Sequence, residues 1–579
     1  MEVTIEDKVV KSTCQALNVP NTDVAGLFME KFRSFKDRDA LVNYATRTTL
    51  TYSQLEDASR RVGAGLQKLG FTPGQKACIQ SYNSTDCLLA VFGTIVAGGS
   101  LVFVKAILTP REVKFQLEDS QPDVVFCDQE NASKTLETYK AIPSVKTLVV
   151  FGSHDGFVSF AELKRCSSSM FQPVTRRGPQ DVLMTIYSSG TTGLPKGVLI
   201  SQNNFITATL LPSHEALQCA RREDAYLCAV PLMHLSGMWT TCFFLAVVAC
   251  AVPLMHLSGM WTTCFFLAVE AVVVLLTGPE PELVLPAIEK YKATAMMTVP
   301  TVAQKLLHSS LFDAYDTSSM NSILFGGSAM PSAVAKGLIE MFNVTSLRQC
   351  YGMTEAVGMV TITPPNTRRY ADVGQPVPGC EIKVVDVETE EKLGPYQHGE
   401  IRMKGPVHFL GYLNRPEATA NLYDSEGFLK SGDIGYYDEQ GNNLYDSEGF
   451  LKSGDIGYYD EQGNFHIVDR IKELIKCMDQ QVAPAELEEL LLQHWAVEEA
   501  AVAGIPHKEY GEAPRAFLVL DPAAAGKVTE DEISRLIADN LAHHKHLHGG
   551  VEFVESIPKS DTFKILRRAL RDAYIQTRC

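Results

Sequence analysis

The chain lacks an excess of basic side chains. It has 52 Lys and Arg residues against 68 Asp and Glu residues, and its formal net charge is −16. Non-specific binding of nucleic acid needs a basic face, so this balance argues against nucleic acid as a partner. With 579 residues, 45% of them hydrophobic and 21% charged, the composition fits a globular protein of two or more domains.

Paired cysteines and targeting signals are also missing. The 14 cysteines form no CxxC pair, and the opening residues MEVTIEDKVV do not have the pattern of a signal peptide. Both absences favour a compartment in which thiols stay reduced. The final residues, Gln576 to Cys579, form neither a peroxisomal Ser-Lys-Leu tripeptide nor a prenylation box. We therefore expect a cytoplasmic protein, or a peroxisomal one only if another signal operates.

Charged side chains are absent between residues 225 and 269, a pattern that invites a transmembrane interpretation. However, Pro, His, Ser and Gly recur in this stretch. Its most continuous apolar run, 242–255, contains Pro253 and is too short to span a bilayer. We expect no transmembrane span. The oligomeric state has no signature in the sequence.

Two tandem duplications stand out. Residues 228–249 recur as 250–271 with one difference, and residues 421–442 recur unchanged as 443–464. Solenoid repeats need at least three copies and tolerate drift between them. The near-perfect pairs therefore indicate either a recent duplication in the gene or an error made when the gene sequence was assembled. The assembly error is the simpler interpretation. The sequence does not decide which copy of each pair is functional.

The order of expected elements indicates an α/β fold. Between residues 76 and 151, apolar runs typical of strands alternate with helical patterns, which predicts a parallel sheet with helices on both faces. Further strands are expected at 293–299, 322–325 and 346–350. Each runs into a loop marked by Gly or Pro, where open α/β sheets bind their ligands. From Gly379 the apolar period becomes two, which predicts an antiparallel barrel or sheet, of which we expect a small β-barrel over about 379–468.

A second domain is expected from Asp469 onward. Helical patterns at 485–495, 530–543 and 564–574 alternate there with strand patterns at 500–505, 514–520 and 551–554. This predicts a compact α+β domain over 469–579. The expected architecture is thus a large N-terminal domain, residues 1–468, of parallel-rich sheets between helices plus a small β-barrel, followed by a small α+β C-terminal domain.

A loop over residues 188–197, with the sequence SSGTTGLPKG, concentrates groups that bind phosphate. Its glycines let backbone N–H groups approach an anion, its hydroxyls add donors, and its lysine adds a point charge. Apolar runs precede and follow it, which predicts strand, loop and strand. The spacing of Gly and Lys differs from that of a Walker A loop.

Four further segments carry suitable chemistry. Residues 322–330 are a strand that ends in bare glycines, and residues 349–355 offer Tyr351 to stack on a flat ring, Thr354 to bind phosphate and Glu355 to hold Mg²⁺. Asp455, or its copy Asp433, with Arg470 suits the two hydroxyls of a ribose. The last segment, 557–564, ends in Lys564. Each segment alone is weak, and their joint presence in this order carries the argument.

In this order the segments resemble the adenylate-forming superfamily of acyl-CoA synthetases, plant 4-coumarate–CoA ligases and beetle luciferases. YSSGTTGLPKGV resembles the phosphate loop of that family, and GGSAM, QCYGMTE, SGD, DRIKELIK and IPKSDTFK resemble its other signatures, as does the segment 411–419. The resemblance covers nearly the whole chain. It implies an ATP-dependent carboxylate–CoA ligase that acts through an acyl-AMP. A luciferase-like monooxygenase and a catalytically impaired homologue remain alternatives.

The resemblance also assigns residues to ligands. ATP, Mg²⁺, CoA and a hydrophobic acid, fatty or arylpropenoic, are the implied ligands. Glu355 would hold Mg²⁺, Thr354 would meet the α-phosphate, and Lys564 would stabilise charge during adenylation. The residues implied in ATP binding are Ser188, Ser189, Gly190, Thr191, Thr192, Gly193, Lys196, Gly326, Gly327, Ser328, Gln349, Tyr351, Gly352, Asp455 and Arg470.

The second half of the implied reaction involves a moving domain and an acyl pocket. The family rotates its small C-terminal domain about a hinge, here next to Asp469, so that a different face carrying Lys476 would meet CoA. The repeated segment PLMHLSGMWTT would line the acyl pocket, with His256 or its copy His234 as the gate.

The chain departs from the family pattern in three places. Phe563 and Asp479 stand where the family has glycine, and Gln202 stands where a histidine is usual. These changes favour adenylation over thioester formation. A histidine-rich stretch, 543–548, is outside all the motifs. Because it has no Cys or Asp partner nearby, we expect a structural role for it and no metal site.

Overall fold

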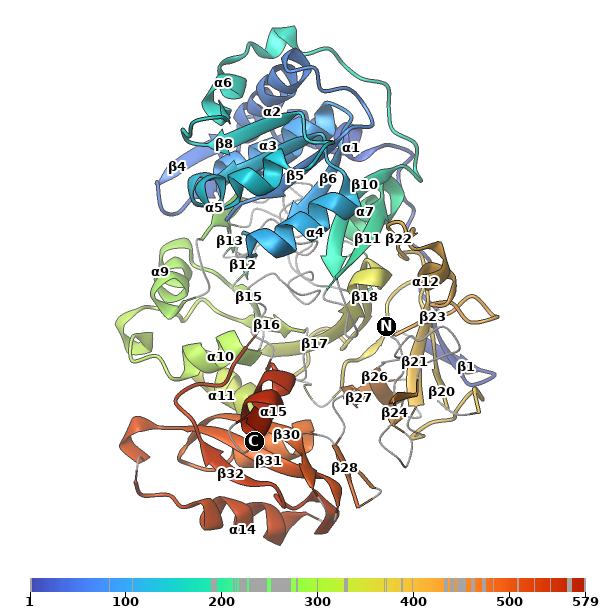
Figure 1. Ribbon diagram of the computed structural model, residues 1–579, viewed down its shortest axis with the longest axis vertical. Coiled ribbons are helices and arrows are strands. Elements are labelled where there is room, and N and C mark those ends of the chain that lie inside the picture. Colours follow the sequence, from blue (N-terminus) through green and yellow to red (C-terminus); the bar gives the residue numbers. More distant parts are fainter. Residues whose placement is uncertain are drawn as a thin grey trace.

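The computed structural model places mixed α/β layers above a separate C-terminal domain (Figure 1). This confirms the expected fold class. The structure describes residues 3–576 apart from positions 83, 107, 189–194, 212–213, 215, 218–225, 229–246, 251–271, 277–279, 299, 327–331, 369, 371, 387–388, 398, 432–435, 438–442, 445–454, 460–463, 471–474, 479, 483, 508–509, 525, 542 and 560–564.

The first α/β sheet contains the expected parallel strands. Its described strands follow the order β22-β11-β10-β6-β5-β7-β8-β9. They are β5 (Lys76–Gln80), β6 (Ser100–Val104), β7 (Val124–Asp128), β8 (Thr147–Phe151), β9 (Val158–Ser159), β10 (Val182–Ser188), β11 (Lys196–Ser201) and β22 (Gly411–Tyr412). Alternate residues point to opposite faces of a strand. Ile79 therefore belongs to one apolar cluster and Cys78 to another.

Helices cover both faces of this sheet. One cluster includes apolar residues of the helices α1 (Val24–Phe35), α2 (Tyr52–Lys68), α3 (Thr85–Val96), α6 (Phe160–Arg165) and α7 (Gln202–Leu210). The cluster on the other face includes those of α4 (Pro110–Ser120) and α5 (Gln129–Lys140). Because helices bury both faces of the sheet, these strands consist of nearly continuous apolar runs.

A second sheet contains the later predicted strands. Its described order is β19-β18-β17-β16-β15-β12-β13-β14-β3-β4. The helices α9 (Pro281–Tyr291), α10 (Pro300–Leu307) and α11 (Ser332–Phe342) lie along it in Figure 1. The strands are β3 (Asp39–Asn43), β4 (Thr48–Thr51), β12 (Tyr226–Cys228), β13 (Val247–Cys250), β14 (Val272–Leu275), β15 (Ala295–Thr298), β16 (Ser322–Phe325), β17 (Ser346–Met353), β18 (Gly358–Ile362) and β19 (Gln375–Pro376).

The antiparallel strands expected after Gly379 form a third sheet. Its described strands run along the open path β1-β2-β20-β21-β26-β27, with β23 paired to β21. They are β1 (Val3–Glu6), β2 (Val9–Ser12), β20 (Glu381–Val385), β21 (Gly399–Lys404), β23 (Leu429–Lys430), β26 (Asp455–Tyr459) and β27 (Phe465–Arg470). The chain's first strands thus pair with β20, a long-range contact without a local sequence signal.

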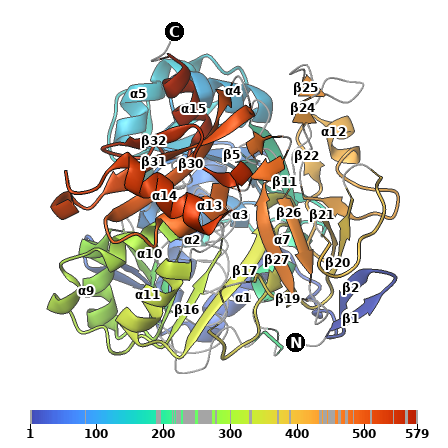
Figure 2. The same cartoon turned by 90° about the horizontal axis from the view of Figure 1, so that it is seen from below.

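The C-terminal domain has helices on both faces of its sheet. In Figure 2, α13 (Pro484–Leu491) and α14 (Glu530–Asn540) lie in front of β30 (Val497–His507) and β31 (Gly511–Leu520), and α15 (Arg567–Gln576) lies behind. Val502 packs in the cluster that includes α13 and α14, whereas its neighbour Ala503 packs in the cluster that includes α15. The remaining strands are β28 (Ile475–Cys477), β29 (Gln480–Val482) and β32 (Gly550–Phe553).

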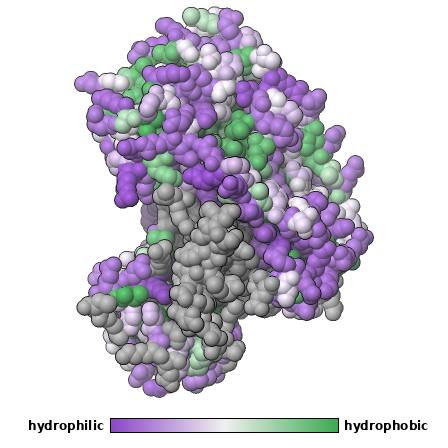
Figure 3. Space-filling view, turned by 45° about the vertical axis from the view of Figure 1, so that its right-hand side comes forward, coloured by the Kyte–Doolittle hydropathy of each residue, from purple (hydrophilic) through white to green (hydrophobic). Residues whose placement is uncertain are grey.

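In the view of Figure 3, hydrophilic side chains predominate among the described residues at the surface, and hydrophobic ones form limited patches. Among the described residues, none of the helices combines the length and the apolar character that crossing a bilayer requires.

Candidate functional site

The predicted phosphate loop is carried by an antiparallel hairpin. β10 and β11 pair from Val182↔Ser201 to Ser188↔Lys196, so Ser188 and Lys196 face each other where the loop leaves the sheet. This confirms the two expected strands. The Ser201 hydroxyl accepts a hydrogen bond from the backbone N–H of Asn204 at 3.0 Å, which starts α7 directly after β11.

One tyrosine connects this hairpin to the predicted magnesium ligand. The Tyr412 hydroxyl donates a hydrogen bond to Oε1 of Glu355 at 2.8 Å, and the Lys196 Nζ lies 5.0 Å from the centre of the Tyr412 ring. Glu355 and Tyr412 are both 8% exposed. Two segments more than 150 residues apart, 196 and 355, therefore meet on Tyr412. Sequence reasoning included Tyr412 in a signature segment but gave it no role.

This arrangement fits a magnesium ion that is shared with a nucleotide. Mg²⁺ is usually held by one or two carboxylates together with phosphate oxygens and water. Glu355 supplies a buried carboxylate, and its backbone carbonyl accepts a hydrogen bond from the Phe409 N–H at 2.9 Å, which holds the residue in place. Thr354, at the start of the same 3-10 turn, is half-buried.

Two of the segments implied in ATP binding, 322–330 and 349–355, have strands that lie side by side. β16 and β17 are parallel with Phe325 opposite Gln349, so Gly326 follows directly at the strand end. Gln349 is 6% exposed, and its Oε1 has no hydrogen-bond partner among the described residues. Tyr351 is half-buried on the same strand. A Cβ on Gly352 would lie 2.1 Å from the Gly358 carbonyl oxygen, so the close approach of β18 requires glycine there.

The predicted ribose pair lies on adjacent strands. Asp455 on β26 is the direct cross-strand partner of Arg470 on β27. Their register places the two residues of the predicted pair directly opposite each other, and their joint contact with a ribose stays a prediction. Asp455 belongs to the second copy of the duplication, and its counterpart Asp433 lies outside the described residues.

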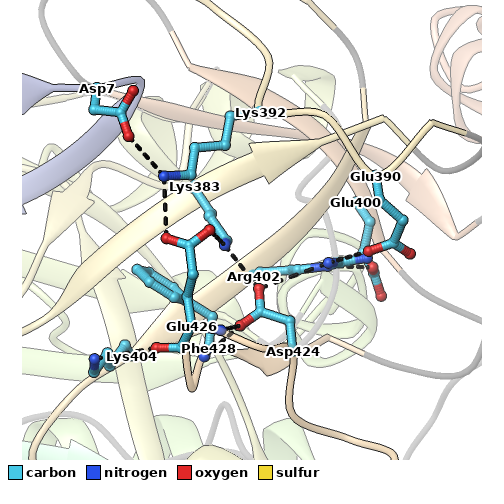
Figure 4. A network of polar contacts seen from close by, with 10 residues as sticks. All are labelled: Asp7, Lys383, Glu390, Lys392, Glu400, Arg402, Lys404, Asp424, Glu426 and Phe428. Carbon is cyan, nitrogen blue, oxygen red and sulfur yellow. Dashed lines mark hydrogen bonds and ion pairs between the residues drawn. The ribbon is translucent and has the colours of Figure 1, made fainter.

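A buried ionic network supports the sheet that carries this pair (Figure 4). Lys383 Nζ lies 2.7 Å from Asp424 Oδ2 and 3.0 Å from Glu426 Oε1. Arg402 Nε lies 2.8 Å from Glu400 Oε2. Lys383 is 3% exposed and Glu400 is fully buried. Because one charge left unpaired at such depth is strongly destabilising, the network fixes how its strands are aligned.

The network extends to the ribose strand through β21. Glu400 on β21 is the cross-strand partner of Ile456, the residue after Asp455. Burial raises the pKa of Glu400 to about 7, although the neighbouring Arg402 lowers it. The first copy of the duplication supplies Asp424, whose pKa is lowered because hydrogen bonds from Lys383 and from backbone N–H groups outweigh its burial.

In the C-terminal domain, the structure describes one of the two predicted catalytic lysines. Lys476 lies on β28, opposite Gln481 of β29. Lys564 lies outside the described residues; near it, Lys559 and Ile565 form a bridge, and the Leu566 N–H donates to the Pro558 carbonyl at 2.9 Å.

Several residues singled out in the sequence lie outside the described residues. Their positions relative to the hairpin and to the ribose pair stay predictions. They are Ser189, Gly190, Thr191, Thr192, Gly193, His234, His256, Gly327, Ser328, Asp433, Asp479, Phe563 and Lys564.

Sequence comparison finds relatives along most of the chain. The model of the AMP-binding enzyme family matches residues 28–248 and 242–413, and that of the AMP-binding enzyme C-terminal domain matches residues 486–564. The chain is 33% identical to a luciferin 4-monooxygenase of Luciola mingrelica, over 92% of this chain and 91% of that protein. It is 31% identical to 4-coumarate-CoA ligase 1 of Narcissus pseudonarcissus, over 94% of this chain and 92% of that protein.

Structure comparison agrees on the fold. An anthranilate CoA ligase in complex with anthranoyl-AMP superimposes with a TM-score of 0.82, covering 97% of this chain and 99% of that chain at 23% sequence identity.

The two ranges that match the AMP-binding enzyme family overlap at residues 242–248, inside the first duplication. The extra copy therefore interrupts an otherwise continuous match.

Proposed function

Since the chain belongs to the family of AMP-binding enzymes, we propose that it activates a hydrophobic carboxylic acid with ATP and transfers the acyl group to CoA. It is an adenylate-forming enzyme of the acid–thiol ligase class. The observation that carries the proposal is the meeting of Lys196 and Glu355 on Tyr412. A cation from the phosphate loop and a buried carboxylate at one point suit a polyphosphate with its metal ion.

In the proposed first step, a carboxylate oxygen of the acid attacks the α-phosphorus of ATP. The bond to the β-phosphate breaks, and the products are an acyl-AMP and pyrophosphate. Lys196 would hold the outer phosphates, and Asp455 with Arg470 would orient the ribose. Glu355 would hold Mg²⁺, which when bound supplies positive charge against the phosphates. Such reactions depend on positioning and charge stabilisation, which Lys564 would complete at the α-phosphate beside Thr354.

In the proposed second step, the thiol sulfur of CoA attacks the acyl carbonyl carbon. A thioester forms, AMP leaves, and the thiol proton is released. Lys476 would serve this step, because it lies on β28 and not in the segment that contains Lys564. Two basic residues on separate elements of one small domain suit a rotation between the two steps.

The substrate class follows from the duplicated segment PLMHLSGMWTT. Small Ser258 beside Trp261 suits an aromatic or a medium-to-long aliphatic acid, with His256 as the gate. The cysteine usage further supports residence in the cytoplasm.

Formation of acyl-CoA from a panel of fatty and cinnamic acids tests the proposal. We expect thioester with at least one acid, in amounts that require both ATP and CoA. Lys476→Ala should abolish thioester formation but leave acyl-AMP formation, whereas Lys564→Ala should abolish both. Thioester formation that survives in Lys564→Ala, or its absence with every acid, would contradict the proposal.

A second candidate is a luciferase-like monooxygenase, which the 33% identity to a luciferin 4-monooxygenase favours. It would share the adenylation step and then consume O₂. Light emission with luciferin, ATP and O₂, without thioester formation from any acid, would support this candidate over the ligase.

A catalytically impaired homologue is the third candidate, and Phe563 and Asp479 motivate it. It predicts ATP binding without turnover, with activity restored by Phe563→Gly. Turnover by the unaltered chain would exclude it.

A further inference from the structure

Three histidines of the C-terminal domain converge on one point. One ring nitrogen of each of His543, His546 and His548 lies within 4.8 Å of those of the other two. The His543 ring packs edge-on against the other two, with centroids 5.0 Å and 4.9 Å away. The sequence suggested a structural role for this stretch because it lacked Cys and Asp partners. The geometry shows instead that the histidines themselves form a group of three.

Backbone hydrogen bonds create the convergence. The stretch folds as the 3-10 turn η8 (His543–Lys545), which brings positions three apart to the same side. A further turn follows, in which the His548 N–H donates to the His546 carbonyl at 2.7 Å and the Gly550 N–H to that of Leu547 at 2.8 Å. These two turns place the third ring beside the first two.

Hydrogen bonds of two of the rings fix which nitrogen carries the proton. Nε2 of His546 lies 3.0 Å from the Leu541 carbonyl oxygen, and Nε2 of His548 lies 2.8 Å from that of His543. A carbonyl only accepts, so each Nε2 carries the proton and Nδ1 keeps a free lone pair in the neutral ring. Histidines that bind metals commonly donate their other ring N–H to a backbone carbonyl in this way.

The surroundings suit a cation. The ammonium group of Lys545, which lies within the turn, is 2.7 Å from both carboxylate oxygens of Glu486, so its positive charge is compensated. Tyr510 packs against His548 with centroids 4.7 Å apart and limits the motion of that ring.

We propose that His543, His546 and His548 form a binding site for a divalent transition metal ion, with Zn²⁺ as the ion that best matches the ligand set. Three imidazoles with an open fourth position are an established zinc environment, and the absence of carboxylates from the group disfavours Mg²⁺ and Ca²⁺. The site is independent of the proposed ligase reaction. It lies against β29, the strand that pairs with the strand carrying Lys476.

Titration of the full chain with zinc chloride, followed by calorimetry, tests the proposal. We expect one equivalent to bind with micromolar or tighter affinity. His543→Gln should lower that affinity at least about tenfold, because it removes one of three ligands. His543 is exposed, so the variant should keep its fold, which circular dichroism checks.

His544→Gln is the matched control, since His544 lies in the same turn but not in the converging group. Its affinity should equal that of the unaltered chain. Replacement of Zn²⁺ by Co²⁺ gives a second readout, because a tetrahedral site produces visible absorption that His543→Gln should remove. The proposal is wrong if the unaltered chain binds no zinc at micromolar concentrations, or if His543→Gln binds it as tightly as His544→Gln does.

Discussion

The strands of the two duplicated regions pair differently in the fold. In the first, the described strands β12, β13 and β14 lie side by side and parallel, with Cys228 opposite Cys250 and Cys250 opposite Leu275. In the second, β23 from the first copy and β26 from the second copy both pair with β21. Between them in the chain, the described strands β24 (Tyr436–Tyr437) and β25 (Asn443–Leu444) pair with each other and stand apart from β21 in Figure 2.

Sheet type explains the difference. Parallel strands need a crossover of a dozen or more residues, which a 22-residue unit supplies, so each copy can add a strand together with its connection. An antiparallel strand has only two edges. β20 pairs with one edge of β21, and β23 and β26 share the other. The described strands β24 and β25 pair with each other and not with β21. The described strands of the first region therefore extend one sheet, whereas those of the second are divided between two sheets.

The largest expected effect is a loss of stability when the buried ionic network beside the second duplication is disrupted. Asp424→Ala removes the carboxylate 2.7 Å from Lys383, which is only 3% exposed, and leaves the lysine the more exposed Glu426 at 3.0 Å. Because a buried charge then loses its buried partner, we expect this part of the molecule to lose up to about 3–5 kcal/mol of stability. Urea denaturation monitored by intrinsic fluorescence measures the loss. Asp446→Ala, the same change in the second copy, should have almost no effect, and equal losses would show that the two copies share the role.

A pH effect is expected next, at His408 beside Tyr423 of the first copy, with ring centroids 6.0 Å apart. Burial, reinforced by the charge of Lys404, lowers the pKa of His408 to about 4. The unfolded chain therefore binds the proton more readily between pH 6.5 and 4, and stability falls as the pH decreases through that window, by about 3 kcal/mol at most.

His408→Phe keeps a ring of similar size and removes the titration. We expect the decrease in urea midpoint between pH 7 and pH 5 to become smaller in this variant than in the unaltered chain. An identical pH dependence in the two proteins would show that His408 is not the group that titrates.

A smaller effect, on kcat/KM for ATP, distinguishes the two copies of the second duplication. Asp455→Ala should lower kcat/KM for ATP about 10- to 100-fold, the equivalent of one lost hydrogen bond that involves a charged group. Asp433→Ala should leave kcat/KM within about twofold, since Asp455 and not Asp433 lies in the described pair with Arg470. Equal losses in acid-dependent ATP turnover would contradict the assignment of the second copy to the ribose.

The smallest effects are expected from a pair of deletions. Deletion of residues 228–249 removes most of β13, narrows the second sheet by about 4.8 Å and shifts the segment that would line the acyl pocket. We expect KM for the acid to change about tenfold, as pocket changes commonly do. Deletion of residues 433–454 recreates the same local sequence, SGDIGYY, and should change stability by only about 0.6 kcal/mol. Steady-state kinetics and thermal unfolding distinguish the two, and a reversed order of effects would overturn the comparison.

Local patterns were enough to predict much of this molecule. The apolar runs around residues 188–197 predicted the strands on either side of the loop, and alternation after Gly379 predicted antiparallel strands. Contacts between distant segments were not predictable. The pairing of β2 with β20 and the role of Tyr412 join residues that are far apart in sequence and carry no mutual signal. The sequence did not predict the group of three histidines, because their convergence depends on the geometry of the turns and not on their spacing in the sequence alone.

Acid-dependent exchange between ATP and labelled pyrophosphate in the full chain tests the central claim most directly. Exchange reports acyl-AMP formation alone, so it does not depend on how CoA or O₂ acts afterwards. We predict exchange that requires an added fatty or cinnamic acid and is lost in Lys196→Ala, whose ammonium group lies over Tyr412. No exchange with any acid of a broad panel would contradict the account, as would exchange of equal rate without added acid.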